Sequence, residues 1–349
     1  MRLEPIAAPS PLRTAVPLGL AALATVATGM ALALIAGGDP FAVLGQIVTG
    51  AVGSRFALLE TLNRATPLIF TGLAVAVAFR AKLWNIGAEA QLYAGALAAT
   101  LIGTGALPWS AWALLPTLAA AAILAGGLCL LWAAWAKVRL GVDEVVTTLL
   151  FNFVMLLLVS MLLEGPLKDP MGMGWPKSER LVAEARLPRL VEGLRLHWGF
   201  GLALISALLV WFVQTRTTWG FEMRAVGAGL PAARFAGIPV NATVLRTALI
   251  SGGLAGLAGF SEVSGAKGAL TLDLSPGYGY TGIVVAMLAL LHPLGVVPAA
   301  LLVAGVFVGA DAMSRAAGVP SYVADILLAS ALLYTVLALL LTRHRVRRG

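Results

Sequence analysis

Residues 66–91 read TPLIFTGLAVAVAFRAKLWNIGAEAQ and join two apolar runs through a short polar segment. This segment places an amide, a carboxylate and a second amide, Asn85, Glu89 and Gln91, at the start of the next apolar run, at 86–103, where they should lie in or near the membrane. Ionisable side chains are costly inside a bilayer and usually mark a pathway for substrate or ions. The three residues are therefore candidates for a translocation path.

The same segment contains Gly87, which permits a break in a helix. Short hydrophobic segments interrupted by glycine are the best sequence indicator of a transporter's central site. The alternative interpretation is an ordinary hairpin at the membrane surface, in which Glu89 pairs with Arg80 or Lys82. The sequence leaves both interpretations open.

The composition of the chain is that of a membrane protein. Of its 349 residues, 60% are hydrophobic and 11% are charged, whereas globular proteins average about 25% charged residues. We expect an all-α membrane protein with about ten transmembrane helices, and a single transmembrane permease domain over residues 1–349. The apolar runs that predict these helices fall at 15–36, 66–79, 86–103, 111–136, 143–163, 199–214, 244–263, 280–292, 294–312 and 323–342.

Lysine and arginine gather on one side of these predicted spans. When the spans alternate, fourteen of the 24 basic residues share a side with both termini, against four acidic residues. The positive-inside rule then places the N-terminus and the C-terminus in the cytoplasm. The net charge of +8 follows from this topology, and it does not require a nucleic-acid partner. One cysteine and three histidines give no basis for a disulfide framework or a metal site.

Two connections are long enough to meet other proteins. The segment at 164–198 is expected on the outer side, where it is either a solvated connection or a docking face for an external partner. Within it, Ser178–Leu196 is predicted to form a surface helix. The segment at 215–242 is expected in the cytoplasm.

No catalytic constellation is recognisable. A P-loop needs Gly-Lys, and none of the five lysines follows a glycine. No G-x-S-x-G motif occurs either. We therefore predict no catalytic residues, no metal and no cofactor in this chain.

The cytoplasmic segment contains the signals of a very short helix. Pro231 suits a first helical turn, Gly237 suits the position after a helix, and Pro239 prevents continuation. A helix of one to two turns is not stable alone, so it must pack on something. Phe235 and Arg234 offer an apolar and a charged contact to a partner protein.

Two further motifs lie in the C-terminal half. Gly252, Gly256 and Gly259 form small-xxx-small pairs that let helix backbones approach closely, within the subunit or in a dimer. Tyr278 and Tyr280 stand among glycines at the start of a short apolar run. These tyrosines indicate either a ligand-facing loop or an interfacial aromatic belt.

As a set, these motifs resemble the nucleoside and simple-sugar branch of bacterial ABC importer permeases, within the branched-chain amino acid and ribose permease family. Trp84–Gln91 is similar to that branch's NIGAEGQ motif, and Ser251–Gly259 is similar to SGGLAGLAG. Similar segments also occur at 66–80, 147–152, 224–238 and 278–295. The sequence departs from the pattern at Ala90, where the family has glycine, at Gly229-Leu230, and at His292, where it has asparagine.

The resemblance implies a type II-like permease fold in the bacterial cytoplasmic (inner) membrane. It also implies several partners: an ABC ATPase that binds the ATP, a second permease subunit, identical or homologous, a periplasmic or lipoprotein substrate-binding protein, and the lipid bilayer. It identifies a coupling helix that sits in a groove of the ATPase. The expected coupling residues are Gly229, Pro231, Ala232, Ala233, Arg234, Phe235 and Gly237.

The main functional prediction is the permease subunit of an ATP-driven importer for a nucleoside or simple sugar. Candidate path residues are Asn85, Glu89, Gln91, Asn152, Tyr278 and Tyr280. Because neutral hydrogen-bonding groups dominate this set, we expect a neutral, hydroxyl-bearing substrate rather than an amino acid. The rival from another class is an ion-coupled secondary transporter, for which Glu89 would be the coupling carboxylate. A membrane enzyme has no supporting constellation.

Overall fold

The computed structural model describes residues 2–5, 11–35, 37, 39–105, 107–317 and 322–347. Residue 36, the last of the first predicted span, and Arg348 lie outside the described residues. The helices are α1 (Pro11–Ile35), α2 (Pro40–Val52), α3 (Arg55–Arg80), α4 (Ala88–Gly103), α5 (Ala111–Leu140), α6 (Glu144–Glu164), α7 (Gly199–Arg216), α8 (Thr218–Ala228), α9 (Leu230–Phe235), α10 (Val240–Ser261), α11 (Tyr278–Leu288), α12 (Pro293–Ala317) and α13 (Val323–Arg343). A π-helical turn at Glu262–Lys267 extends α10, and two short strands, β1 (Arg2–Pro5) and β2 (His344–Arg347), pair antiparallel.

Six helices among the described residues are long and apolar enough to cross a membrane, namely α3, α5, α6, α7, α10 with its π-helical turn, and α12. The pair α1 and α2, bent by 115°, is a seventh if it counts as one span. The other predicted spans fall on α4, with 16 residues, on α11, with 11, and on α13, where residues 325–338 form a shorter apolar helix. The chain is therefore a helical, multi-pass membrane protein whose long spans number six or seven.

Two helix boundaries differ from the sequence-based expectation. Helix α3 begins at Arg55 rather than near residue 66, because it continues through Glu60 and Arg64, which interrupt the apolar run without breaking the helix. Helix α2 was not predicted at all. It begins where the Asp39 carboxylate accepts a hydrogen bond from the Phe41 N–H at 3.0 Å, with proline in the first turn.

The described chain forms two compact units, whose boundary falls within α3 and α12. One contains residues 1–61 and 302–349, and the other contains residues 62–301. In the first, α1 and α13 pack together, and the Thr28 and Tyr334 hydroxyls lie 3.0 Å apart. That the whole chain is one domain stays a prediction.

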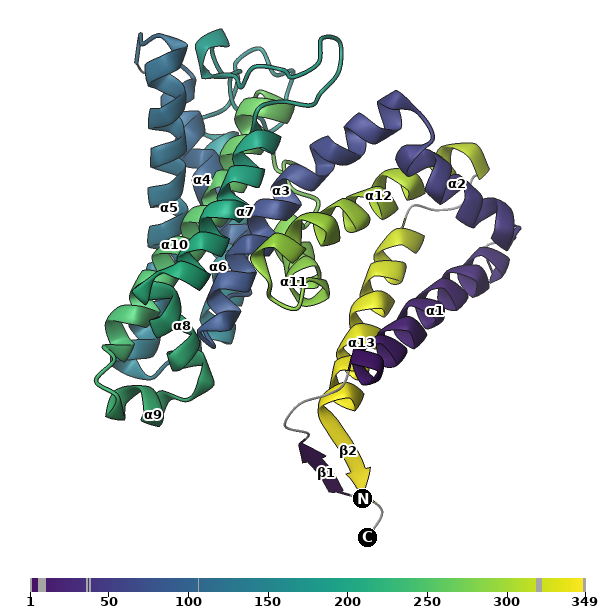
Figure 1. Ribbon diagram of the computed structural model, residues 1–349. Coiled ribbons are helices and arrows are strands. Elements are labelled where there is room, and N and C mark those ends of the chain that lie inside the picture. Colours follow the sequence, from purple (N-terminus) through teal and green to yellow (C-terminus); the bar gives the residue numbers. More distant parts are fainter. Residues whose placement is uncertain are drawn as a thin grey trace. The chain divides into compact units, whose positions relative to one another are not determined.

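The unit of residues 62–301 is a helix bundle built around α10. This helix packs mainly on α5 and α4, and most of its length is buried. In Figure 1, α8 and α9 lie at one end of this bundle, and the long connection between α6 and α7 lies at the other. The two functional segments expected on opposite sides of the membrane are therefore at opposite ends.

Tryptophans mark both ends of α5. Trp112 is exposed near its start, and Trp132 and Trp135, whose rings stack at 5.1 Å, are exposed near its end. The helical rise from Trp112 to Trp132 is about 30 Å, which is the thickness of a bilayer's hydrocarbon core. Between them, Leu124 and Leu128 are exposed. This face of α5 thus has the length and the aromatic ends of a lipid-facing surface.

The connection between α6 and α7 does not contain the predicted surface helix over Ser178–Leu196. Only a short 3₁₀ turn, Ala183–Ala185, is helical there. Instead, its backbone bonds to the chain after α10: the Ser178 N–H donates to the Leu270 carbonyl at 2.9 Å, and the Leu187 N–H donates to the Ser264 carbonyl at 2.8 Å. The expectation was wrong because these long-range bonds satisfy the backbone that a helix would have satisfied internally.

His197 lies at the end of this connection, two residues before α7 begins. Its side chain is fully buried, and its Nδ1 accepts a hydrogen bond from the Gly199 N–H at 3.1 Å. Burial lowers the pKa of the imidazole to about 4. His197 is therefore neutral at physiological pH and has a structural position in the connection.

Candidate functional site

The polar segment after α3 is a genuine break between two helices. Helix α3 ends at Arg80, Lys82 has a left-handed backbone with φ +53°, and α4 begins at Ala88. Within the break, side chains hold backbone groups that a continuous helix would bond itself. The Ile86 N–H donates to the Thr148 hydroxyl at 3.2 Å, for example. We call residues 81–87 the junction.

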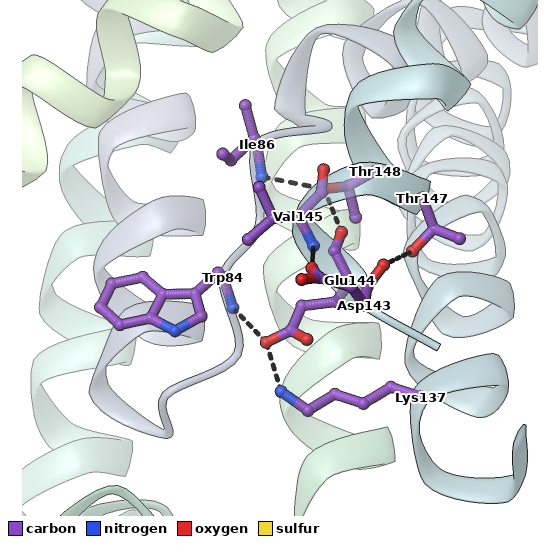
Figure 2. A network of polar contacts seen from close by, with 8 residues as sticks. All are labelled: Trp84, Ile86, Lys137, Asp143, Glu144, Val145, Thr147 and Thr148. Carbon is purple, nitrogen blue, oxygen red and sulfur yellow. Dashed lines mark hydrogen bonds and ion pairs between the residues drawn. The ribbon is translucent and has the colours of Figure 1, made fainter. Parts of the chain in front are cut away.

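Figure 2 shows how α6 supports the junction. Glu144 accepts a hydrogen bond from the Trp84 N–H at 3.3 Å and forms an ion pair with Lys137 across the turn between α5 and α6. The Asp143 carboxylate caps α6 by accepting a hydrogen bond from the Val145 N–H at 2.7 Å. The neighbouring acid therefore has a different partner: Glu144 ties α5 and α6 to the junction.

Asn85 and Gln91 bind each other. Each amide donates to the other's oxygen, at 2.9 and 2.8 Å, and both side chains are buried. Asn85 also donates to the Ser251 hydroxyl at 3.0 Å, which in turn donates to the Ala74 carbonyl at 2.7 Å. The amides thus have protein partners here, and they hold α3, α4 and α10 together around the junction.

Asn152 joins three elements. Its Oδ1 accepts from the Ala90 N–H at 2.9 Å, and its Nδ2 donates to the Ile86 carbonyl and to the Tyr280 hydroxyl, both at 3.0 Å. Asn152 is buried, whereas Tyr280 is 39% exposed. Of the residues in this network, Tyr280 is the one whose side chain reaches an open surface.

Glu89 lies where two short helices begin. It is in the first turn of α4, is 3% exposed, and its Oε2 accepts a hydrogen bond from the Gly279 N–H, in the first turn of α11, at 2.6 Å. Its partner is therefore α11 rather than Arg80 or Lys82, the partners considered from sequence. Helix N-termini carry partial positive charge, so the single Glu89 carboxylate stabilises the N-termini of both α4 and α11.

The segment before α11 is fixed by Tyr93. The Tyr93 hydroxyl donates to the Leu272 carbonyl at 2.6 Å and accepts from the Ser275 N–H at 3.3 Å. The Ser275 hydroxyl in turn accepts a hydrogen bond from the Tyr278 N–H, at the first residue of α11, at 2.8 Å. Tyr278 is buried in the first turn of α11 rather than in an open loop. Sequence reasoning missed Tyr93 and Ser275, whose roles depend on contacts distant in the chain.

At one end of the bundle, α9 is a helix of six residues. Gly229 precedes it, Pro231 is in its first turn, and Gly237 follows with φ +77°. Its two faces differ sharply: Ala233 is 3% exposed and Phe235 is 97% exposed. The remaining expected coupling residues, Ala232 and Arg234, are also exposed.

Helix α10 meets its neighbours at glycines. A Cβ at Gly252 would collide with the Gly126 carbonyl oxygen of α5, and one at Gly259 would collide with the Leu92 carbonyl oxygen of α4. Gly256 lies against the Ala122 carbonyl oxygen of α5 in the same way. The three glycines thus pack helices within this subunit.

We expect Gly256→Val to destabilise the protein by about 3 kcal/mol, because the added side chain must push α5 away from α10. Gly45→Val is the matched control, since a Cβ at Gly45 in α2 has no atom within 4 Å. Thermal unfolding in detergent measures both. Equal melting temperatures for the two variants would contradict this account of the packing.

Comparison with known proteins bears on the same region. Residues 57–341 match the family model described as the branched-chain amino acid transport system permease component. The chain belongs to this permease family. The match includes the junction, the polar network and α9, so the site described above lies inside the matched residues.

Three relatives resemble the permease over most of their length. The glucose ABC transporter permease protein TsgB13 of Haloferax volcanii is 36% identical over 95% of this chain and 90% of its own. The guanosine ABC transporter permease protein NupP of Bacillus subtilis is 36% identical over 90% of this chain and 91% of its own. The nucleoside ABC transporter permease protein NupB of Lactococcus lactis is 26% identical over 88% of this chain and 86% of its own.

Proposed function

We propose that this permease forms one half of the translocation path of an ATP-driven importer in the bacterial inner membrane. The second half is another permease subunit, identical or homologous, an ABC ATPase binds the ATP, and an external binding protein delivers the substrate. The observation that carries this proposal is the similarity to sugar and nucleoside ABC permeases over at least nine-tenths of the chain.

The proposed topology keeps both termini in the cytoplasm. The segments are the seven long spans, with α1 and α2 as one, and the shorter helices α4, α11 and α13, in a type II-like arrangement. With this topology α9 is cytoplasmic and offers Phe235 and Arg234 to the ATPase. The connection between α6 and α7 is then external, where it can meet the binding protein.

We propose a neutral, hydroxyl-bearing substrate, with a nucleoside ahead of a simple sugar. A substrate carboxylate or phosphate would favour a helix N-terminus, but Glu89 already occupies the N-termini of α4 and α11. The exposed ring of Tyr280 offers a surface on which a base or sugar stacks. Asn85, Gln91 and Asn152 would not contact the substrate. They would hold the helices around the path in position, since their side chains hydrogen-bond to other residues of the protein.

Uptake by the reconstituted complex tests the substrate class. Proteoliposomes containing the permease, its ATPase and its binding protein should accumulate radiolabelled guanosine or glucose, and excess leucine should not compete. The reason is that leucine carries a carboxylate, whereas Glu89 already occupies the helix N-termini that would favour one. Leucine accumulation that neither guanosine nor glucose inhibits would contradict the proposed substrate class.

A further inference from the structure

Helix α8 meets the end of α3 backbone to backbone at Gly227. A Cβ at Gly227 would collide with the Arg80 carbonyl oxygen and would lie 3.4 Å from the Ala81 Cα. Gly227 therefore contacts the chain where α3 ends, at Arg80, and the junction begins, at Ala81. Any larger residue must move either α8 or the junction.

The same helix leads into α9. Only Gly229 separates α8 from α9, and the Ala233 N–H of α9 donates to the Gly229 carbonyl at 2.9 Å. Val226 of α8 and Ala233 of α9 share one buried apolar cluster with Leu83 of the junction. Because packed interiors are not continuously deformable, groups in one cluster move together.

The other side of the junction leads to α4 and α11. The Gly87 N–H is held by the Asn85 side chain at 3.0 Å, and the next residue begins α4. A Cβ at Gly279 would collide with the Glu89 backbone nitrogen, so the first turns of α4 and α11 are also in direct backbone contact. A continuous chain of close contacts thus runs from α9 to the start of α11.

We propose that Gly227 and Leu83 are positioning residues that transmit motion of α9 to the junction, and through it to the first turns of α4 and α11. The junction is the element able to change, because side chains rather than a helical ladder hold three of its backbone N–H groups, those of Trp84, Ile86 and Gly87. Such bonds can exchange partners without unfolding a helix. This inference rests on the proposed function, which supplies the moving ATPase.

The test separates ATP hydrolysis from transport in the complete reconstituted complex. Gly227→Ala should leave co-purification with the ATPase and the rate of ATP hydrolysis within about twofold of wild type, and should lower uptake per ATP about tenfold. Alanine favours helix more than glycine does, so a defect cannot come from weaker helix formation in α8. Gly45→Ala adds the same methyl group in open space and should leave all three quantities unchanged.

Leu83→Ala provides a second variant that removes a contact instead of adding one. It should lower uptake per ATP in the same way, and the double variant should be no worse than the stronger single variant, because both act on one contact chain. If Gly227→Ala does not assemble with the ATPase, uptake per ATP is measured with Leu83→Ala alone.

Normal uptake per ATP, or uptake and ATP hydrolysis that fall in proportion, would overturn the inference. The probe is whichever of guanosine and glucose the wild-type complex accumulates; if it accumulates neither, the proposed function fails instead.

Discussion

Phe235→Asp is expected to abolish ATP-driven uptake by preventing the ATPase from binding. Phe235 projects from α9 and is 97% exposed, so its aromatic ring makes little contact with the described residues of its own subunit. Buried aromatic anchors dominate protein interfaces, and losing one costs about 2–4 kcal/mol. We therefore expect co-purification with the ATPase to fall by at least about thirtyfold.

Two controls make this result specific. Phe235→Tyr keeps an aromatic ring and should retain most of the uptake. The melting temperature of Phe235→Asp should equal that of wild type, because a fully exposed residue contributes little to folding.

A substitution at Ala233 would not test the contact with the ATPase. Ala233 is buried among its own subunit's residues, so a carboxylate in Ala233→Asp would disturb the fold. Normal ATPase binding by Phe235→Asp would contradict the assignment of α9.

Glu89→Ala is expected to lower uptake more than about tenfold and the free energy of unfolding by about 2–3 kcal/mol. Alanine leaves the Gly279 N–H without its acceptor in a buried place and removes the charge that favours the first turns of α4 and α11. Glu89→Gln keeps an acceptor but loses the charge, so its loss of stability should be smaller, about 1 kcal/mol.

The ranking of the Glu89 variants, in stability and in uptake, is what tests this role of Glu89. Thermal unfolding and uptake should both rank wild type above Glu89→Gln and Glu89→Gln above Glu89→Ala. Glu164→Gln, at the exposed end of α6, removes the same charge and should change neither measurement. If Glu89→Ala unfolds and transports as wild type does, the first turns of α4 and α11 are not held together as described. Normal uptake by Glu89→Gln combined with Asn85→Ala would further reject a pathway role.

Local chemistry made α9 predictable. A proline in the first turn and a glycine after the last are signals that act over a few residues, and the structure has the helix between them. Helix α3 was predicted too short because its apolar run starts after Glu60 and Arg64, although charged residues are compatible with a helix. The surface helix predicted over 178–196 failed because its backbone partners, such as Leu270, lie far along the chain.

The sequence was enough to predict which residues belong to the candidate site, but not how they are arranged in space. Asn85, Glu89 and Gln91 stood out because polar side chains are rare in apolar runs. Asn85 and Gln91 bind each other, but the other partners could not be predicted, because Ser251 and Gly279 come from helices more than a hundred residues away. Likewise, Gly227 carries no local signal of its contact with Arg80.

The energy source of uptake distinguishes an ATP-driven importer from an ion-coupled transporter. Proteoliposomes that hold the permease, its ATPase and its binding protein should accumulate guanosine or glucose only when ATP is supplied on the ATPase side. Ionophores that collapse proton and sodium gradients should leave the rate unchanged, because an ATP-driven importer needs no coupling ion at Glu89. Uptake without ATP that an imposed ion gradient drives and an ionophore abolishes would contradict ATP-driven import and indicate a secondary transporter.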